Sequence, residues 1–242
     1  INAGELITLD NKNKDFFFFE KKDVRSVMGA LVYLVKTRLP EYIGASPFEI
    51  QVLTPMRKGE LGVEHLNEVL QYYLNPASES KKEKEGRTGV FREGDKVMQV
   101  KNNYKLEWKI TNAKGFSIEE GLGVFNGDMG IIKQINTYSE RITVVFDENR
   151  EAEYPFSSLD ELELAYAITI HKSQGSEYPA VVLPLLSGPP ILCNRNLLYT
   201  AITRAQKCVA IAGRQSMVEQ MIHNETEQKR YSGLNDCLKE GL

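Results

Sequence analysis

The chain is poor in cysteine and has no long hydrophobic run. Its three cysteines, Cys193, Cys208 and Cys237, are odd in number and form no CxxC pair. This argues against a disulfide framework and a zinc site, and it fits the cytoplasm. No apolar run approaches the about 20 residues that span a bilayer, and nothing at the N-terminus resembles a signal peptide. We therefore predict a cytoplasmic protein with no membrane partner and no metal ligands of its own.

Net basic charge is also lacking. The 30 Lys and Arg residues are outnumbered by 33 Asp and Glu residues, which gives a formal net charge of −3 and an isoelectric point near 5.8. A protein that coats duplex DNA normally carries a basic face and a high isoelectric point. A single-strand channel needs only a local line of donors and stacking platforms, so it remains compatible with this balance.

Hydrophobic patterning predicts an α/β fold in the first and last parts of the chain. At 242 residues the chain exceeds the usual single domain, so we expect one domain with an insertion, or two domains. Four phenylalanines at 16–19 favour a strand buried on both faces. A helix should begin after Asp23, a good N-cap, run to Arg38 and be stopped by Pro40. The pattern also predicts strands at 5–9, 49–54, 164–170, 180–184 and 208–212, and helices at 63–73, 195–205 and 215–223.

The middle of the chain has a different pattern. Residues 75–92 carry a dense run of mixed charge, which is typical of a solvated, mobile linker. Short strands then follow at 127–135, 141–147 and 151–154, separated by Gly, Asn and Asp turns. Several short strands at this spacing predict a small β-barrel, in which the stretch 104–123 has no clear assignment.

The stretch from Glu163 to Pro184 places a polar turn between two strand signals. Residues 171–177 read HKSQGSE and combine hydrogen-bonding side chains with a glycine. In α/β proteins ligands bind outside the carboxyl ends of strands, where such groups can contact phosphates and ribose hydroxyls. By composition alone, an ordinary polar loop is an equal alternative.

Particular strings in this part of the chain resemble known motifs. TIHKSQGSEYPAVV resembles motif V of superfamily 1 helicases, and LYTAITRA at 198–205 resembles motif VI. LTPMRKGELGVEHLNEVLQ resembles motif IVa, and VFNGDMGIIKQI resembles an inserted SH3-like barrel. Together these strings resemble the RecD-like DNA helicases, the exodeoxyribonuclease V alpha-subunit family.

The resemblance implies an α/β fold, namely a RecA-like (P-loop NTPase-type) second motor domain with a parallel sheet, interrupted by an inserted small SH3-like β-barrel. We expect residues 1–102 and 161–242 to form the RecA-like domain and 103–160 the barrel. The longer stretch at 104–123 departs from the family pattern.

The resemblance also implies a nucleotide site. Arg204 matches the catalytic arginine that reaches the γ-phosphate of ATP, and a planar, always-charged fork suits that group. Glu177 matches the carboxylate that accepts from the ribose, and Gly175 the glycine that lets the backbone approach the ligand. The alternative for Arg204 is a surface arginine paired with a carboxylate.

A set of residues is implied to contact single-stranded DNA. Thr169, His171 and Ser173 lie in the motif V string, and Thr54, Arg57 and Lys58 lie in the motif IVa string. A satisfied core histidine is the alternative for His171, and a solvated surface charge is the alternative for Lys58.

No GxxxxGK[ST] phosphate loop occurs in the chain. Asp160 and Glu161 superficially resemble an acidic magnesium-binding pair, but no apolar strand precedes them. The first residue is Ile1 rather than Met, which suggests an excised fragment. We therefore expect ATP with Mg²⁺ to be bound mainly by a missing N-terminal motor domain, no cofactor to be held tightly by this chain, and the chain alone to be inactive.

The function implied is the C-terminal motor portion of an ATP-dependent 5′–3′ DNA helicase in repair and recombination. Its partners would be single-stranded DNA, the N-terminal half of the same helicase, and the nuclease and helicase subunits of an exodeoxyribonuclease V-type complex. Two alternatives stay open. One is a non-catalytic module that binds nucleic acid or a partner, and the other is a relaxase-linked helicase domain of a conjugation system.

Overall fold

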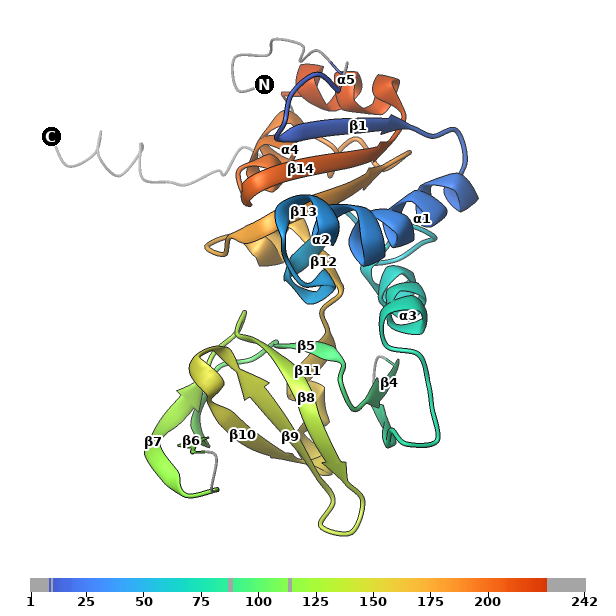
Figure 1. Ribbon diagram of the computed structural model, residues 1–242. Helices are drawn as coiled ribbons and strands as arrows, with labels where there is room; N and C mark the ends of the chain where they lie inside the picture. The colour runs from blue at the N-terminus through green and yellow to red at the C-terminus, as the bar shows by residue number, and fades with distance from the viewer. Residues whose placement is uncertain (1–8, 10, 87–88, 113–114, 226–242) are drawn as a thin grey trace, which may run out of the picture.

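A parallel five-stranded sheet forms the upper part of the molecule in Figure 1. The computed structural model describes residues 9, 11–86, 89–112 and 115–225, so the strand predicted at 5–9 lies almost wholly outside the described residues. The strand order is β1-β14-β13-β2-β12, and every pairing is parallel. The strands are β1 (Phe16–Glu20), β2 (Ile50–Thr54), β12 (Ala167–Thr169), β13 (Tyr178–Leu185) and β14 (Ala205–Gly213).

Helices cover both faces of this sheet. Along β13, Val182 joins a core cluster with residues of α1 and α3, whereas Val181 and Leu183 join a second cluster with α4 and α5. This alternation follows from the two-residue period of a strand that is buried on both faces. The helices are α1 (Val24–Tyr33), α2 (Leu39–Ile43), α3 (Val63–Leu74), α4 (Arg195–Ile202) and α5 (Gln215–His223).

Two predictions about the N-terminal elements were wrong in detail. Pro40 does not stop the first helix, because a π-helical turn, η1 (Leu34–Arg38), precedes α2 and the proline lies in the first turn of α2. A proline at that point removes no hydrogen bond from a helix interior. The helix ends instead at Gly44, which has φ +66°. The phenylalanines of β1 are less buried than expected, since among the described residues β1 pairs only with β14, and of the four phenylalanines only Phe18 is buried.

A second, antiparallel sheet lies below the first and is called the barrel sheet here (Figure 1, green to yellow). Its strand order is β11-β5-β8-β9-β10-β6-β7. The three strands predicted between 127 and 154 are present, and the unassigned stretch 104–123 forms the hairpin β6–β7. The strands are β5 (Lys96–Gln99), β6 (Asn103–Thr111), β7 (Ser117–Val124), β8 (Met129–Asn136), β9 (Arg141–Phe146), β10 (Glu151–Pro155) and β11 (Leu162–Leu164).

The barrel sheet extends beyond residues 103–160 at both ends. Its outer strands β5 and β11 pair with each other, and the backbone N–H of Val100 donates to the carbonyl of Glu161 at 2.8 Å. The two ends of the expected insertion are therefore neighbours. The strand predicted at 164–170 is in fact two short strands, β11 in the barrel sheet and β12 in the parallel sheet, because the chain crosses between the sheets at Ala165 and Tyr166.

The charged segment 75–92 is not an unstructured linker. It contains the two-stranded hairpin β3 (Glu83–Gly86) and β4 (Gly89–Arg92). Arg92 is buried, and its guanidinium donates to the Glu83 carboxylate at 2.6 Å and to the Asn75 carbonyl at 2.6 Å. The charge run suggested a solvated segment because sequence alone does not show which of its charges are paired.

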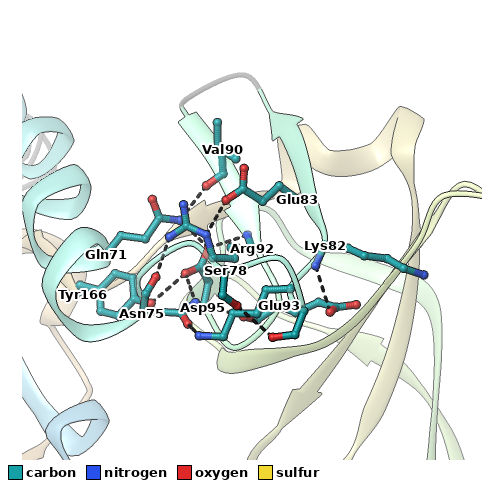
Figure 2. A network of polar contacts seen from close by, with 12 residues as sticks. Gln71, Asn75, Ser78, Lys82, Glu83, Val90, Arg92, Glu93, Asp95 and Tyr166 are labelled. Atoms are coloured by element: carbon teal, nitrogen blue, oxygen red, sulfur yellow. Dashed lines mark hydrogen bonds and ion pairs between the residues drawn. The ribbon is translucent and has the colours of Figure 1, made fainter.

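A buried carboxylate, Asp95, connects this hairpin to both sheets (Figure 2). One oxygen accepts from Asn75 Nδ2 at 2.7 Å and from Tyr166 Oη at 2.8 Å, and the other from Gln71 Nε2 and the Arg92 backbone N–H, both at 2.6 Å. The donors come from α3 and its C-cap Asn75, from β4, and from the crossing between β11 and β12. Asp95 therefore fixes the position of the barrel sheet relative to the parallel sheet.

Candidate functional site

The predicted site residues divide into two groups, one at the carboxyl ends of the parallel strands (the carboxyl edge) and one at their amino ends (the amino edge). Thr54 of β2 pairs with Thr169 of β12, and both lie at the carboxyl ends of their strands. Tyr178 of β13 pairs with Ala205 of β14 at the amino ends, next to Glu177. The loop 170–177 runs from one edge to the other, so only its first half lies at the carboxyl edge that the sequence predicted for all of it.

Three hydroxyls at the carboxyl edge form hydrogen bonds with backbone groups of the protein itself. Thr54 is buried and donates to the Leu61 carbonyl at 2.7 Å. Ser173 is fully buried and donates to the Ile170 carbonyl at 2.7 Å. Thr169 is half-buried, and its hydroxyl caps the following 3₁₀ turn by accepting from the Lys172 N–H at 3.3 Å. In this structure the three hydroxyls therefore stabilise the adjacent loops and are not directed to a ligand at the surface.

The charged groups at the same edge are accessible. Lys58 and His171 are exposed, so His171 is not a core histidine. Arg57 Nη2 donates to Glu163 Oε1 at 2.6 Å, and Lys172 Nζ donates to Glu163 Oε2 at 2.8 Å. Burial by itself would raise the pKa of Glu163, but the hydrogen bonds from Lys172 and Arg57 outweigh it and lower that pKa. Glu163 is therefore ionised at neutral pH.

At the amino edge, Arg204 lies just beyond the helix that was predicted to carry it. α4 ends at Ile202, and Arg204 occupies the turn before β14. Its guanidinium donates to the Ser176 carbonyl at 3.2 Å, the Thr200 carbonyl at 3.3 Å and the Thr203 hydroxyl at 3.3 Å. Among the residues the structure describes, no carboxylate forms an ion pair with Arg204. The guanidinium is therefore positioned by neutral acceptors and keeps its charge uncompensated.

Glu177 and Gly175 lie in the loop next to Arg204. Glu177 is exposed, and its carboxylate accepts from Gln206 Nε2 at 3.3 Å. Gly175 has φ +88°, and a Cβ placed on it would meet no atom within 4 Å. The glycine is thus favoured by its backbone conformation. A groove of ≈ 570 Å³ opens here, and Ser176, Glu177 and residues of β8 and β9 are among those that line it.

Two family models match the chain. The model of the ATP-dependent RecD-like DNA helicase SH3 domain matches residues 66–146, and that of the UvrD-like helicase C-terminal domain matches residues 164–212. The ATP-dependent RecD2 DNA helicase of Deinococcus radiodurans is 39% identical over 167 residues. The chain belongs to the RecD-like helicase family. The predicted fold class is confirmed with it: an α/β fold whose RecA-like parallel sheet is accompanied by an SH3-like barrel.

This RecD-like chain covers only part of its relatives. The match to the Deinococcus radiodurans protein takes in 69% of the chain and 20% of that helicase. The RecBCD enzyme subunit RecD of Mycolicibacterium smegmatis is 30% identical over 191 residues, which are 79% of the chain and 29% of the relative. A crystal structure of Pif1 helicase from Bacteroides in complex with ADP-AlF3 and ssDNA matches 89% of the chain and 53% of its own, at a TM-score of 0.43 and 16% identity.

The structure adds Glu163 and Lys172 to the residues of the candidate site. Lys172 stands inside the motif V string, so the motif itself could have pointed to it. Glu163 could not be found in this way, because its partner Arg57 is 106 positions away along the chain. Within the described ranges, no three His, Cys, Asp or Glu side chains are grouped to hold a metal ion. None of the helices in those ranges is long and apolar enough to cross a bilayer.

Proposed function

We propose that this chain is the C-terminal motor portion of an ATP-dependent 5′–3′ DNA helicase. The observation that carries the proposal is the Arg204 guanidinium, which neutral acceptors hold beside the Ser176–Glu177 loop with no carboxylate partner among the described residues. An arginine whose charge is left uncompensated at the edge of an α/β sheet is suited to a phosphoryl group. The exposed carboxylate of Glu177 lies in the same loop and would accept from the ribose.

The chain would contribute only part of the ATP site. The sequence has no GxxxxGK[ST] loop, so the lysine of that loop and the ligands of Mg²⁺ would come from the first motor domain of the same protein. Bound Mg²⁺ would neutralise charge that develops on the phosphates. Arg204 would contact the γ-phosphoryl oxygens as their charge spreads in the transition state, and Gly175 would shape the loop beside the nucleotide.

Single-stranded DNA would bind at the opposite edge of the sheet. There Arg57, Lys58 and His171 present donors, while Thr54, Thr169 and Ser173 hold the two loops. Separation of the nucleotide and DNA groups across one sheet supports a motor in which closure on ATP changes the grip on the strand. We extend the proposal to repair and recombination, and to nuclease and helicase partners, as the resemblance to the exodeoxyribonuclease V alpha-subunit family implies. Relatives that match the chain are named subunits of the RecBCD enzyme.

Replacing Arg204 by Ala in the full-length protein tests the proposal. We expect ATP hydrolysis to fall roughly 10³-fold or more, the scale on which arginine fingers act. Nucleotide affinity should fall far less, since the contact strengthens in the transition state. Arg204→Lys should not restore the rate, because an ammonium cannot reproduce the planar fork. Steady-state hydrolysis and nucleotide titration measure the two quantities.

Arg214→Ala is the matched control. Arg214 follows the carboxyl end of β14, and its guanidinium donates to the Lys22 carbonyl at 2.8 Å, away from the Glu177 loop. This variant should hydrolyse ATP at the wild-type rate. Near wild-type hydrolysis by Arg204→Ala would remove Arg204 from the active site and leave a module that binds nucleic acid or a partner protein.

A further inference from the structure

One carboxylate at the DNA-facing edge holds two basic side chains from different loops. Glu163 accepts from Arg57 Nη2 at 2.6 Å through Oε1 and from Lys172 Nζ at 2.8 Å through Oε2. Arg57 follows β2, whereas Lys172 lies in the turn η5 (Ile170–Ser173) that follows β12. The three groups therefore meet where the carboxyl ends of two neighbouring parallel strands lie together.

Of these three side chains, the Glu163 carboxylate is the least exposed and the most restrained by its surroundings. Glu163 lies on β11 between Leu162 and Leu164, which are both buried, and its side chain is 20% exposed. The side chains of Arg57 and Lys172 are 46% and 31% exposed. Because β11 belongs to the barrel sheet, the barrel supplies the anion and the parallel sheet supplies both cations.

Both cations keep donors that Glu163 does not use. An arginine has five N–H donors and a lysine three, all available to oxygen acceptors. In the described structure Lys172 Nζ donates only to Glu163, and Arg57 has one further contact, from Nε to Glu64 Oε1 at 3.4 Å. Accessible donors on two converging cations suit an anionic oxygen group such as a phosphate.

The charges within this group of four side chains cancel. Arg57 and Lys172 contribute two positive charges, and Glu163 and Glu64 contribute two negative ones. A phosphate at this point would find donors but no excess of positive charge, and it would compete with Glu163 for both cations. An arrangement of this kind binds a phosphate weakly and releases it easily.

We propose that Arg57 and Lys172 form a phosphate-binding pair for single-stranded nucleic acid, and that Glu163 competes with the phosphate for both cations and so keeps phosphate binding weak. The inference rests on the proposed function, because only a strand that moves along this edge requires frequent release. The low pKa of Glu163 supports it, since burial is outweighed by the bonds from Lys172 and Arg57 and the competitor stays charged.

Glu163→Gln in the full-length protein is the direct test, with fluorescence anisotropy of a labelled oligothymidylate at several salt concentrations. Partly exposed ion pairs contribute about 0.2–1 kcal/mol, so the strand should bind roughly 1.4- to 5-fold more tightly. The slope of log affinity against log salt should steepen by up to about 0.7, the value for one additional single-strand phosphate contact.

Glu64→Gln is the matched control. Glu64 contacts the same arginine, but at a longer distance and with 43% side-chain exposure, so its replacement should have a smaller effect. Lys172→Gln should weaken binding and reduce the effect of Glu163→Gln in the double variant. Lys172→Gln also keeps the inference testable if Glu163→Gln does not fold, because strand affinity unchanged by Lys172→Gln would overturn it.

The possible outcomes distinguish a failure of the proposed function from a failure of this inference. If the wild-type protein binds no single-stranded DNA at any salt concentration, the DNA-binding part of the proposed function is wrong, and the inference with it. If the wild-type protein binds but Glu163→Gln leaves affinity unchanged or lowers it, the inference alone is overturned.

Discussion

Lys96 places an amino group inside the junction between the two sheets. Its Nζ donates to the Phe48 carbonyl at 2.7 Å and to Gln51 Oε1 at 2.8 Å, and the residue is 6% exposed. Burial lowers the pKa of Lys96 to about 7, while the charges of Glu49 and Asp147 act in the opposite direction. An amine with this pKa changes charge near neutrality, which is unusual for lysine.

This pKa predicts a pH-dependent stability. Between about 7 in the folded protein and 10.5 in the unfolded chain, the unfolded chain binds the proton more tightly. The free energy of unfolding should therefore rise with pH across this window, and the gain is lost progressively as pH falls from the unfolded pKa to the folded pKa. Relative to Lys96→Met, the wild-type protein should gain up to about 2 kcal/mol between about pH 7 and pH 9, measured by urea unfolding. A difference between the two proteins that does not change with pH would contradict the prediction.

Sequence motifs predicted some of the site residues but not the direction of their side chains. Motif strings place Arg204 and Glu177 in one neighbourhood, and the structure brings their loops together. The strings do not show which way a side chain faces, so Ser173 was expected at the surface and lies inside. They also do not show an ion pair between distant segments, which is why Glu163 was not among the predicted residues.

At the scale of elements, the Asp95 network holds three segments together. Gln71 lies on the buried side of α3, and Asn75 is the C-cap residue that follows the helix, so both reach the same carboxylate. Burial raises the pKa of Asp95 despite its hydrogen bonds from Asn75, Tyr166 and Gln71. The position of α3 is thereby tied to β4 and to the crossing between β11 and β12.

Asp95→Ala should strongly destabilise the protein. The change leaves buried donors of Gln71, Asn75 and Tyr166 without an acceptor, and an unsatisfied buried group costs about 1–3 kcal/mol. We expect a loss of about 3 kcal/mol in the free energy of unfolding, measured by urea titration. Glu79→Ala, at an exposed glutamate, should change it by less than about 0.5 kcal/mol. Equal effects of the two substitutions would show that the network does not stabilise the junction.

Elements with a long, regular pattern were predictable, and those that depend on distant partners were not. The 3.6-residue period predicts α3 and α5 closely, since packing of one apolar face determines them. Tyr73 continues the apolar spacing of Leu66 and Leu70 but is exposed, because the buried face of that helix carries Asn67 and Gln71 instead. Polar side chains that bond across 100 positions, as Asn67 does to Ala167, cannot be distinguished from surface residues in the sequence.

At the scale of the whole molecule, the two sheets share one hydrophobic core. A single cluster of buried side chains includes Leu31 of α1 and Leu66 of α3 together with Ile132 and Val144 of the barrel sheet. The division into residues 1–102 with 161–242 and residues 103–160 stays a prediction. The pairing of β5 with β11 shows that the barrel sheet begins before 103 and continues past 160.

The 242-residue chain by itself should not hydrolyse ATP. It offers Arg204 and Glu177, but its sequence has no phosphate loop. Without that lysine and the Mg²⁺ ligands, the phosphates cannot be positioned for attack by water. Phosphate release by the purified chain should equal the rate in buffer, and the full-length protein serves as the positive control. Hydrolysis by the chain above that background would show that it contains a complete catalytic site.

The side-by-side ends of the barrel sheet have a consequence for the order of folding. Gln51 of β2 and Ala165, just before β12, are 114 positions apart, yet they must meet to complete the parallel sheet. The barrel sheet is built from a continuous part of the chain, so it can form through more local contacts. Once β5 and β11 have paired, the barrel no longer contributes to the loop between β2 and β12, which lowers the entropy cost of closing that loop by about 1 kcal/mol. The insertion therefore assists the folding of the sheet that it interrupts.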